Sequence, residues 1–413
     1  MSTVKTALCR TFQAAMKLGN YFLPFRIPET LRGPGCVKQL PEELRKKGVR
    51  RALLVTDKGL MKLGLPRGLM EALEASGVPY TLFCEIQPNP TDEDVEAGFR
   101  VFREAGCDAI VVMGGGSAMD CAKAIAAKNA HPRKSIARLQ GVITVHKRVV
   151  PMWAIPTTAG TGSETTVAAV ITIAETKHKA SINDPVLMPR YAVLDPELTL
   201  CLPPHITSTT GMDALCHAVE SYLNHSYCTK LEKDFAKRAV RLVKDNLYAA
   251  YLDGSDMKAR QNLQLAAFYA GRSFTRGCVG YIHAVGHTLS GLYGLPHGLV
   301  MSVLMPHVLR QYGPKVHRRL AELAEACGIQ GGSREERAER FIAWIEEMNR
   351  KMCIPRGLDC ILPEDVPQII RWADREANPL YPVPQVWEEA DFRRLLDTVV
   401  VNTEARRRHG RTA

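Results

Sequence analysis

The sequence lacks several patterns that would assign it to a simple class. Its twelve cysteines include no C-x-x-C pair. This argues against a zinc ribbon or a thioredoxin-type site and favours reduced thiols in the cytoplasm. No segment approaches the roughly 18 uninterrupted apolar residues that a membrane span requires. We therefore expect a soluble, cytoplasmic protein with no membrane partner.

Acidic residues are in the minority. Asp and Glu number 43 against 54 Lys and Arg, which gives a formal net charge of +11. Part of the excess lies at the C-terminus, in Arg406, Arg407, Arg408 and Arg411. The other basic residues are spread among acids and form no aromatic-rich stripe of the kind that binds single-stranded nucleic acid. We expect no nucleic-acid partner, whereas a modest positive field suits an anionic dinucleotide.

The first 28 residues contain no acid at all. They carry four basic side chains, at Lys5, Arg10, Lys17 and Arg26. This composition faintly resembles a mitochondrial transit peptide. A helix from Lys5 to Asn20, packed on the body through Phe12, Met16 and Leu18, accounts for the same residues, and we favour it.

Two domains are expected because 413 residues exceed the usual limit of a single core. Apolar runs typical of buried strands alternate with helical patterns in the first half, at 52–56, 80–85, 109–113, 151–155 and 192–194. After Pro203-Pro204 helical patterns dominate, at 211–223, 230–245, 257–274, 298–311 and 334–352. Strands alternating with helices predict a parallel sheet. The sequence thus predicts an α/β domain over residues 1–203 and an all-α domain over residues 204–413.

A glycine triplet follows the third expected strand. Gly114-Gly115-Gly116-Ser117 leads into a helix at 118–127. Glycines let backbone N–H groups approach phosphate oxygens, and a helix N-terminus favours negative charge. Ser117 and Asp120 also fit a capping box, so they could merely close the helix.

The dinucleotide fingerprint G-x-G-x-x-G is absent. Asp57, at the end of the first strand, could bond a ribose hydroxyl and repel a 2′-phosphate, favouring NAD over NADP, although from the residues alone an ordinary turn is the better explanation. A second polar loop, from Thr157 to Glu164, could bond a nicotinamide amide and diphosphate, or could be only a polar loop.

The most specific signal is a set of acid and histidine positions in the second half. Asp213 and His217 stand at i and i+4, so they share one helical face within reach of one ion. His283 and His287 repeat that spacing, and His297 follows Pro296 at an expected helix start. The spacing predicts one metal centre but leaves open whether His283 or His287 binds.

These stretches resemble the iron-containing, or group III, alcohol dehydrogenase family. The resemblance rests on VTDKGL, PNPT, GGGSAMDCAKAIA, IPTTAGTGSE, LDPELT, GMDALCHAVESYL and GYIHAVGHTLSGLYGLPHG, and so covers nearly the whole chain. It implies a dehydroquinate synthase-like fold, with a nucleotide-binding domain over residues 1–203 and a metal-binding and substrate domain over residues 204–413. It implies metal ligands at Asp213, His217, His283 and His297, with His287 as a proton-relay residue. It also implies cofactor contacts at Asp57, Asn89, Gly115, Gly116, Ser117, Asp120, Thr157, Thr158 and Lys179.

The function that this resemblance implies is an NAD-linked alcohol dehydrogenase or aldehyde reductase acting on small primary alcohols or diols. A divalent metal, Fe(II) or alternatively Zn(II), would act as the Lewis acid. NADP is the less favoured cofactor, and a homodimer or larger assembly is expected. The alternatives are a glycerol dehydrogenase-like zinc polyol oxidoreductase, a dehydroquinate-synthase-like lyase, and a non-enzymatic metal- or nucleotide-binding protein.

Overall fold

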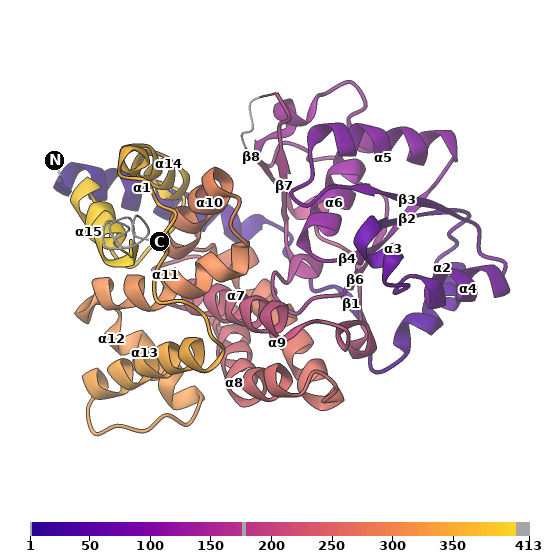
Figure 1. The fold of residues 1–413 in the computed structure, drawn as a ribbon. Coiled ribbons are helices and arrows are strands. Elements are labelled where there is room, and N and C mark those ends of the chain that lie inside the picture. Colours follow the sequence, from indigo (N-terminus) through magenta and orange to yellow (C-terminus); the bar gives the residue numbers. More distant parts are fainter. Residues whose placement is uncertain (1, 176–178, 402–413) are drawn as a thin grey trace, which may run out of the picture. The chain divides into compact units, whose positions relative to one another are not determined.

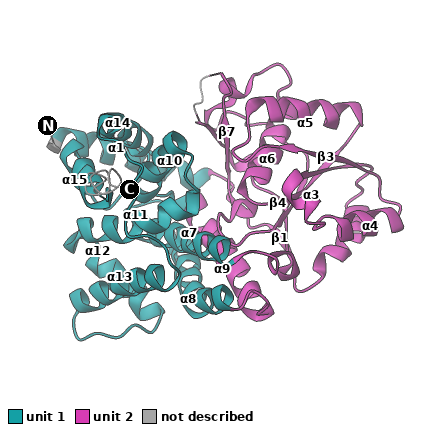
Figure 2. Cartoon of the chain, viewed as in Figure 1, with its two compact units in different colours: residues 1–22, 204–252, 276–413 teal, residues 23–203, 253–275 magenta. Residues whose placement is uncertain are grey.

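The computed structural model describes residues 2–175 and 179–401, which form two compact units (Figure 1; Figure 2). One unit contains residues 23–203 and 253–275, and the other contains residues 1–22, 204–252 and 276–413. The chain crosses between the two units after residues 22, 203, 252 and 275, so the division into 1–203 and 204–413 stays a prediction. Residues 1–22 and 253–275 are each grouped with the other half of the chain. The Arg-rich tail, with Arg406, Arg407, Arg408 and Arg411, lies outside the described residues.

A six-stranded parallel sheet organises the α/β unit. Its strands, in spatial order, are β1 (Glu29–Arg32), β9 (Tyr191–Leu194), β6 (Met152–Pro156), β4 (Ala109–Gly114), β2 (Ala52–Asp57) and β3 (Tyr80–Ile86). All five neighbouring pairs are parallel. The carboxyl ends of β2, β4 and β6 therefore meet at one edge of the sheet, and the loops that follow them carry the expected cofactor residues.

Alternate residues of the central strands enter two separate cores. Leu53 and Val55 of β2 pack with α5 (Asp92–Glu104) and α6 (Gly116–Ala130). Ala52 and Leu54 pack with α2 (Leu40–Lys46) and α4 (Arg67–Ala75). Because successive strand side chains point to opposite faces, the two helix pairs cover opposite faces of the sheet. Burial on both faces explains the continuous apolar runs that predicted these strands.

The remaining elements of this unit are short or polar. They are α3 (Lys58–Lys62), the first nineteen residues of α9 (Met257–Gly277) and a three-stranded sheet of β5 (Gly141–Val142), β8 (Lys179–Asn183) and β7 (Ala168–Thr172). The sequence analysis missed β1, β5, β7 and β8, because strands of only two to five residues are too short to show a clear periodic pattern.

The second unit is helical. Its helices are α1 (Ser2–Phe22), α7 (Pro204–Leu223), α8 (Lys230–Leu252), α10 (Tyr281–Tyr293), α11 (His297–Tyr312), α12 (Pro314–Ala326), α13 (Arg334–Lys351), α14 (Val366–Ala377) and α15 (Glu389–Val399). The predicted fold class, a parallel α/β domain followed by a helical domain, is confirmed. Over residues 2–175 and 179–401, no helix combines the length and the apolar character needed to cross a membrane.

Helix α1 forms as expected, but its packing was predicted wrongly. Phe12 and Leu18, expected to pack on the body, are 40% and 66% exposed, and Met16 is half-buried. The side chains buried instead include the polar residues Gln13 and Asn20. The helix was correctly predicted from its period, but the assumption that its apolar face turns inward was wrong.

Close backbone approach fixes α9 against the loop that follows β6. A Cβ atom on Gly271 of α9 would lie 2.2 Å from Thr165 Oγ1 and 2.6 Å from the Gly162 carbonyl oxygen. Gly162 itself has φ +60°, which favours glycine. The α9 backbone thus determines where the polar loop 157–166 lies.

We expect Gly271→Ala to destabilise the protein by about 1–3 kcal/mol, because the added methyl group overpacks a backbone contact. Gly68→Ala in α4 is the matched control, since a Cβ there meets nothing within 4 Å. Urea unfolding followed by circular dichroism measures both. Equal midpoints for the two variants would contradict the close approach.

Candidate metal centre and cofactor loops

Helix α7 presents Asp213 and His217 one turn apart, both buried. The helix begins at Pro204, nine residues before Asp213. The helix predicted at 211–223 therefore begins seven residues earlier than expected. The hydroxyls of Thr209 and Thr210 lie inside the helix and donate to the carbonyls of His205 and Ile206, the back-bonding typical of these side chains.

The other two histidines come from the starts of α10 and α11. His283 lies in the first turn of α10, and His297 is the first residue of α11 after Pro296. A Cβ on Gly298 would lie 2.5 Å from the carbonyl oxygen of Thr209 in α7. Glycine at this position lets the start of α11 approach α7 closely enough to bring His297 to Asp213.

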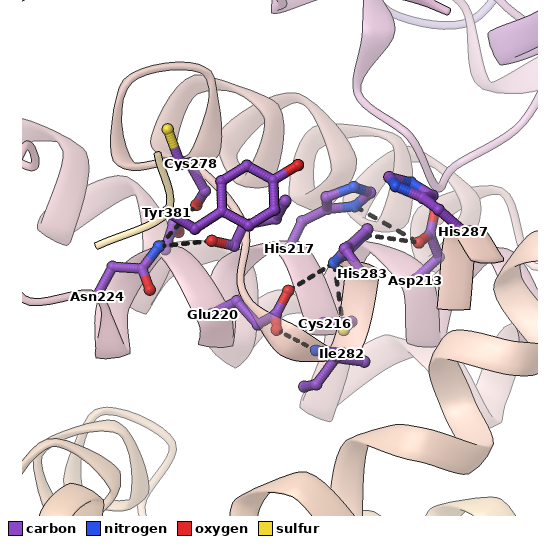
Figure 3. A network of polar contacts seen from close by, with 12 residues as sticks. Asp213, Cys216, His217, Glu220, Asn224, Cys278, Ile282, His283, His287 and Tyr381 are labelled. Carbon is purple, nitrogen blue, oxygen red and sulfur yellow. Dashed lines mark hydrogen bonds and ion pairs between the residues drawn. The ribbon is translucent and has the colours of Figure 1, made fainter. Parts of the chain in front are cut away.

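Four donor atoms, from Asp213, His217, His283 and His297, all lie within 4.8 Å of one another. Figure 3 shows Asp213, His217 and His283 side by side. Asp213 Oδ1 is 3.3 Å from His297 Nε2, 3.6 Å from His217 Nδ1 and 3.8 Å from His283 Nε2. Among the described residues, buried Asp213 Oδ1 and His283 Nε2 have no hydrogen-bond partner. Buried polar atoms rarely lack a hydrogen-bond partner. One carboxylate with three imidazoles is a set of donors that binds iron or zinc. The residues fit a divalent metal ion.

The electrostatics of the cluster place His217 and Asp213 in the protonation states that bind a metal. Burial lowers the pKa of His217 to about 3, against the attraction of Asp213, so the ring is neutral at pH 7. Burial opposes ionisation of Asp213, but His217, His297 and His283 outweigh it and hold the carboxyl pKa well below its usual range. An ionised carboxylate beside a neutral imidazole is the form that coordinates a cation.

Glu220 supports His283 and was missed by the sequence analysis. Its Oε2 lies 2.6 Å from His283 Nδ1, and its Oε1 accepts from the Ile282 N–H at 2.8 Å (Figure 3). A Cβ on Gly280 would lie 2.7 Å from that Oε1. Such an outer carboxylate fixes the tautomer of a ligating histidine, leaving Nε2 for the metal. Residues 213, 217 and 220 share one helical face, so the spacing alone could have identified it.

A second group, Cys216, Glu220 and His283, has the donor types of a metal site. Its geometry does not favour that role. His283 Nδ1 is engaged by Glu220, and Cys216 Sγ lies 3.9 Å from the same nitrogen. Burial raises the pKa of the Cys216 thiol to about 12, so it is protonated at pH 7 and a poor ligand.

His287 lies outside the four-atom group, which agrees with its expected role beside the ligands. Its ring is 5.2 Å from that of His297, centroid to centroid, and its Nδ1 is 2.7 Å from Glu376 Oε1. Tyr381 donates to the same Glu376 oxygen at 3.0 Å. The sequence gave no sign of these partners, because Glu376 is 89 residues from His287.

The glycine turn lies at the carboxyl end of β4 in the α/β unit. Gly115 is the N-cap of α6, and a Cβ on Gly116 would lie 3.0 Å from Thr161 Cγ2 in the next loop. The capping-box alternative for Ser117 is wrong, since Ser117 already lies inside the helix and no side chain caps it. Asp120 faces the neighbouring loop, accepting from Ser163 Oγ and the Val170 N–H at 3.1 Å each.

Lys123, also missed, joins these loops from within α6. Its Nζ donates to Ser163 Oγ and Thr166 Oγ1 at 2.8 Å and to the Ala168 carbonyl at 2.9 Å. Its side chain is fully buried, and burial lowers its pKa to about 8 against the attraction of Asp120. A lysine within a helical pattern is normally exposed, so the burial of Lys123 could not be predicted from the sequence.

The other expected cofactor residues lie around the same sheet edge. Thr157 donates its N–H to the Gly114 carbonyl at 3.2 Å, and Thr158 Oγ1 lies 3.5 Å from where a Gly115 Cβ would be. Asp57 ends β2 and caps α3 by accepting from the Leu60 N–H. The structure also brings together Lys179 and Asn89, at 3.1 Å between Nζ and Oδ1. No described hydrogen bond joins that pair to the glycine turn.

Comparison with known proteins agrees with this geometry. The family described as iron-containing alcohol dehydrogenase matches residues 28–196, and its C-terminal family matches residues 207–400. The chain is 39% identical over 340 residues to an NAD-dependent methanol dehydrogenase of Bacillus methanolicus (82% of this chain, 88% of that protein). It is 37% identical over 352 residues to a 1,3-propanediol dehydrogenase of Klebsiella pneumoniae (84% and 90%).

The solved structures agree as well. A 1,3-propanediol oxidoreductase superposes with a TM-score of 0.87 at 34% identity, covering 92% of this chain and all of that one. The chain belongs to the iron-containing alcohol dehydrogenase family. It is an NAD-linked oxidoreductase that interconverts alcohols and aldehydes, and the predictions of family and activity are confirmed.

We expect Glu220→Gln to lower metal affinity by about 10- to 100-fold, because the amide no longer fixes the His283 tautomer. Glu376→Gln is the matched control. It removes a carboxylate at nearly the same distance from a histidine Nδ1, but from His287, which is outside the four-atom group. Competition with a chromophoric chelator measures both affinities. Equal losses in the two variants would argue against the assigned ligand set.

Proposed function

We propose that the protein reduces small aldehydes, and oxidises the matching primary alcohols or diols, with a divalent metal held by Asp213, His217, His283 and His297. The observation that carries the proposal is the convergence of four donor atoms on one point, with Asp213 Oδ1 and His283 Nε2 buried and without hydrogen bonds among the described residues. Fe(II) is the proposed ion, supported by the family description, and Zn(II) suits the same donors.

When bound, the ion supplies Lewis-acid polarisation of the substrate oxygen. The chain's own groups hold the site ready for this chemistry. Glu220 fixes His283, while His217 is already neutral and Asp213 already ionised, the states in which they bind a cation. His287, with Nδ1 facing Glu376, keeps Nε2 available to exchange a proton with substrate or water.

We assign the dinucleotide to the carboxyl edge of the parallel sheet. Gly115, Gly116 and Ser117 offer backbone N–H groups at the start of α6 for the diphosphate. Thr157 and Thr158 begin the adjoining loop, which Asp120 and Lys123 hold through Ser163. Asn89 and Lys179 form a further polar pair in the same unit. This supports a cofactor-binding role for residues 1–203 and a metal- and substrate-binding role for residues 204–413.

The substrate class follows from relatives whose names specify methanol, 1,3-propanediol and lactaldehyde. These are short alcohols, diols and an aldehyde, so we propose an unbranched substrate of few carbons. All twelve cysteines are free thiols, which supports a reducing, cytoplasmic location. We further propose a homo-oligomer, with a dimer as the smallest assembly.

The decisive experiment is anaerobic purification followed by metal analysis and an NADH assay with short aldehydes. We expect activity to be lost on chelation and restored by Fe(II) or Zn(II). His283→Ala should lose metal and turnover together, whereas His307→Ala, on an exposed ring that contacts only the Arg356 carbonyl among described hydrogen-bond partners, should keep both. A metal-free His283→Ala enzyme with full activity would overturn the ligand assignment.

Cofactor choice gives a separate prediction. Asp57 ends β2 at the edge that carries the glycine turn, and a carboxylate there accepts bonds from a ribose hydroxyl and repels a 2′-phosphate. We expect Asp57→Asn to raise kcat/KM for NADPH relative to NADH by about tenfold or more, since two like charges about 4 Å apart repel by about 1–4 kcal/mol near a protein surface. Asp57→Asn also retains a cap acceptor for Leu60, so stability is preserved. An unchanged ratio would show that Asp57 only caps α3.

A further inference from the structure

Helix α1 is amphipathic, but its polar side packs on the body and its apolar side is exposed to solvent. On one side Lys5 donates to Asp374 and the Trp387 carbonyl, and Gln13 donates to the Pro379 and Tyr381 carbonyls. Arg10 reaches the Pro384 carbonyl on the same side. Helix α1 thus packs beside α14 and the segment before α15 mainly through polar groups (Figure 1). A surface helix of a globular protein normally turns its apolar face inward.

The opposite side carries an exposed stripe. It consists of Val4, Leu8, Thr11, Ala15, Leu18 and Phe22, which we call the outer stripe, and every member is exposed. Val4 and Leu8 are 65% and 66% exposed, and Leu18 and Phe22 are 66% and 75% exposed. Successive members of the outer stripe are alternately four and three residues apart. This is the 3.5-residue period of a coiled-coil seam, and it continues over about 27 Å of helix.

Charge is absent from the outer stripe and its immediate flanks. At 100° per residue, Ala7 and Ala14 border it on one side and Phe12 and Gly19 on the other. Lys5 and Arg10 are turned toward the body, so only Lys17 remains exposed without a described partner, and it lies well off the stripe. A helix that adsorbs to an anionic lipid surface needs a basic polar face, which α1 does not offer. The chemistry instead fits another apolar helix face of the same period.

The outer stripe is complementary to itself when two copies run antiparallel. In that register Val4 faces Phe22, Leu8 faces Leu18, and Thr11 faces Ala15, so that each large side chain meets a smaller or equal one. The small flanking residues Ala7 and Ala14 allow close approach of the two backbones. Residues 1–27 precede the part of the chain that matches the family, so the stripe adds to the shared fold.

We propose that α1 is a self-association surface: the outer stripe of one chain pairs antiparallel with that of a second copy. The contact is isologous, so each α1 pairs with one other copy of α1. One helix pair of this length buries less than the ~800 Å² per partner of a standard interface, so the association weakens on dilution. The pairing concerns residues remote in sequence from the metal and cofactor residues, and it stands whether or not the proposed substrate is correct.

Sedimentation equilibrium from low to high micromolar protein tests the pairing. We expect Leu8→Glu/Leu18→Glu to halve the wild-type assembly mass, because the antiparallel register sets carboxylates against each other. Leu252→Glu is the matched control, since Leu252 is as exposed as Leu8 and Leu18 but lies on α8, and it should keep the wild-type mass. Equal masses for wild type and Leu8→Glu/Leu18→Glu would overturn the proposal.

A charge exchange tests the direction. Leu8→Glu/Leu18→Lys places opposite charges face to face only in the antiparallel register, so it should regain the wild-type mass. Failure to regain the mass would overturn the antiparallel arrangement. Co-sedimentation with phosphatidylserine–phosphatidylcholine vesicles by wild type but not by Leu8→Glu/Leu18→Glu, with no difference in their assembly mass, would replace self-association by lipid binding.

Discussion

The burial of one carboxylate among three imidazole rings is the constraint on which the helical unit depends. An uncompensated buried carboxylate costs several kcal/mol, and the Asp213 side chain is only 3% exposed. Its compensation comes from α7, α10 and α11 together, so none of these helices can shift without uncovering a charge. The need to surround Asp213 also explains two glycines in this unit. Gly298 allows α11 to reach α7, and Gly280 leaves room for the carboxylate of Glu220 beneath α10.

The buried amine of Lys123 constrains the α/β unit as Asp213 constrains the helical unit. Lys123 is surrounded by two hydroxyls and a carbonyl, all from the segment 163–168, and Asp120 reaches the same Ser163. Burial raises the pKa of nearby Glu164 to about 7, with Lys123 opposing the rise. The helix that begins at the glycine turn therefore also holds the next loop. The glycine turn and the polar loop 157–166, to which we assign the dinucleotide, are therefore positioned by one element, which limits how far the two can separate.

These two sites show what the sequence could predict. Asp213 and His217 share a turn of one helix, so their proximity is a local property that spacing reveals. The buried parallel strands were equally local, because burial on both faces requires continuous apolar runs. Lys123 and Glu376 could not be recognised in the same way. A lysine in a helix pattern looks solvated until the loop it binds is placed, and Glu376 meets His287 only through the packing of α14 on α10.

The orientation of helix α1 is another feature that the sequence alone did not predict. Its period correctly predicts two faces, but period alone does not decide which face the body accepts. The segment 378–388 is irregular and presents carbonyl groups that no helix or sheet satisfies. Backbone acceptors that become buried need donors, and Lys5, Arg10 and Gln13 supply them at four positions. The hydrogen-bonding demand of that segment therefore decides the orientation of α1, and the apolar stripe is turned outward as the consequence.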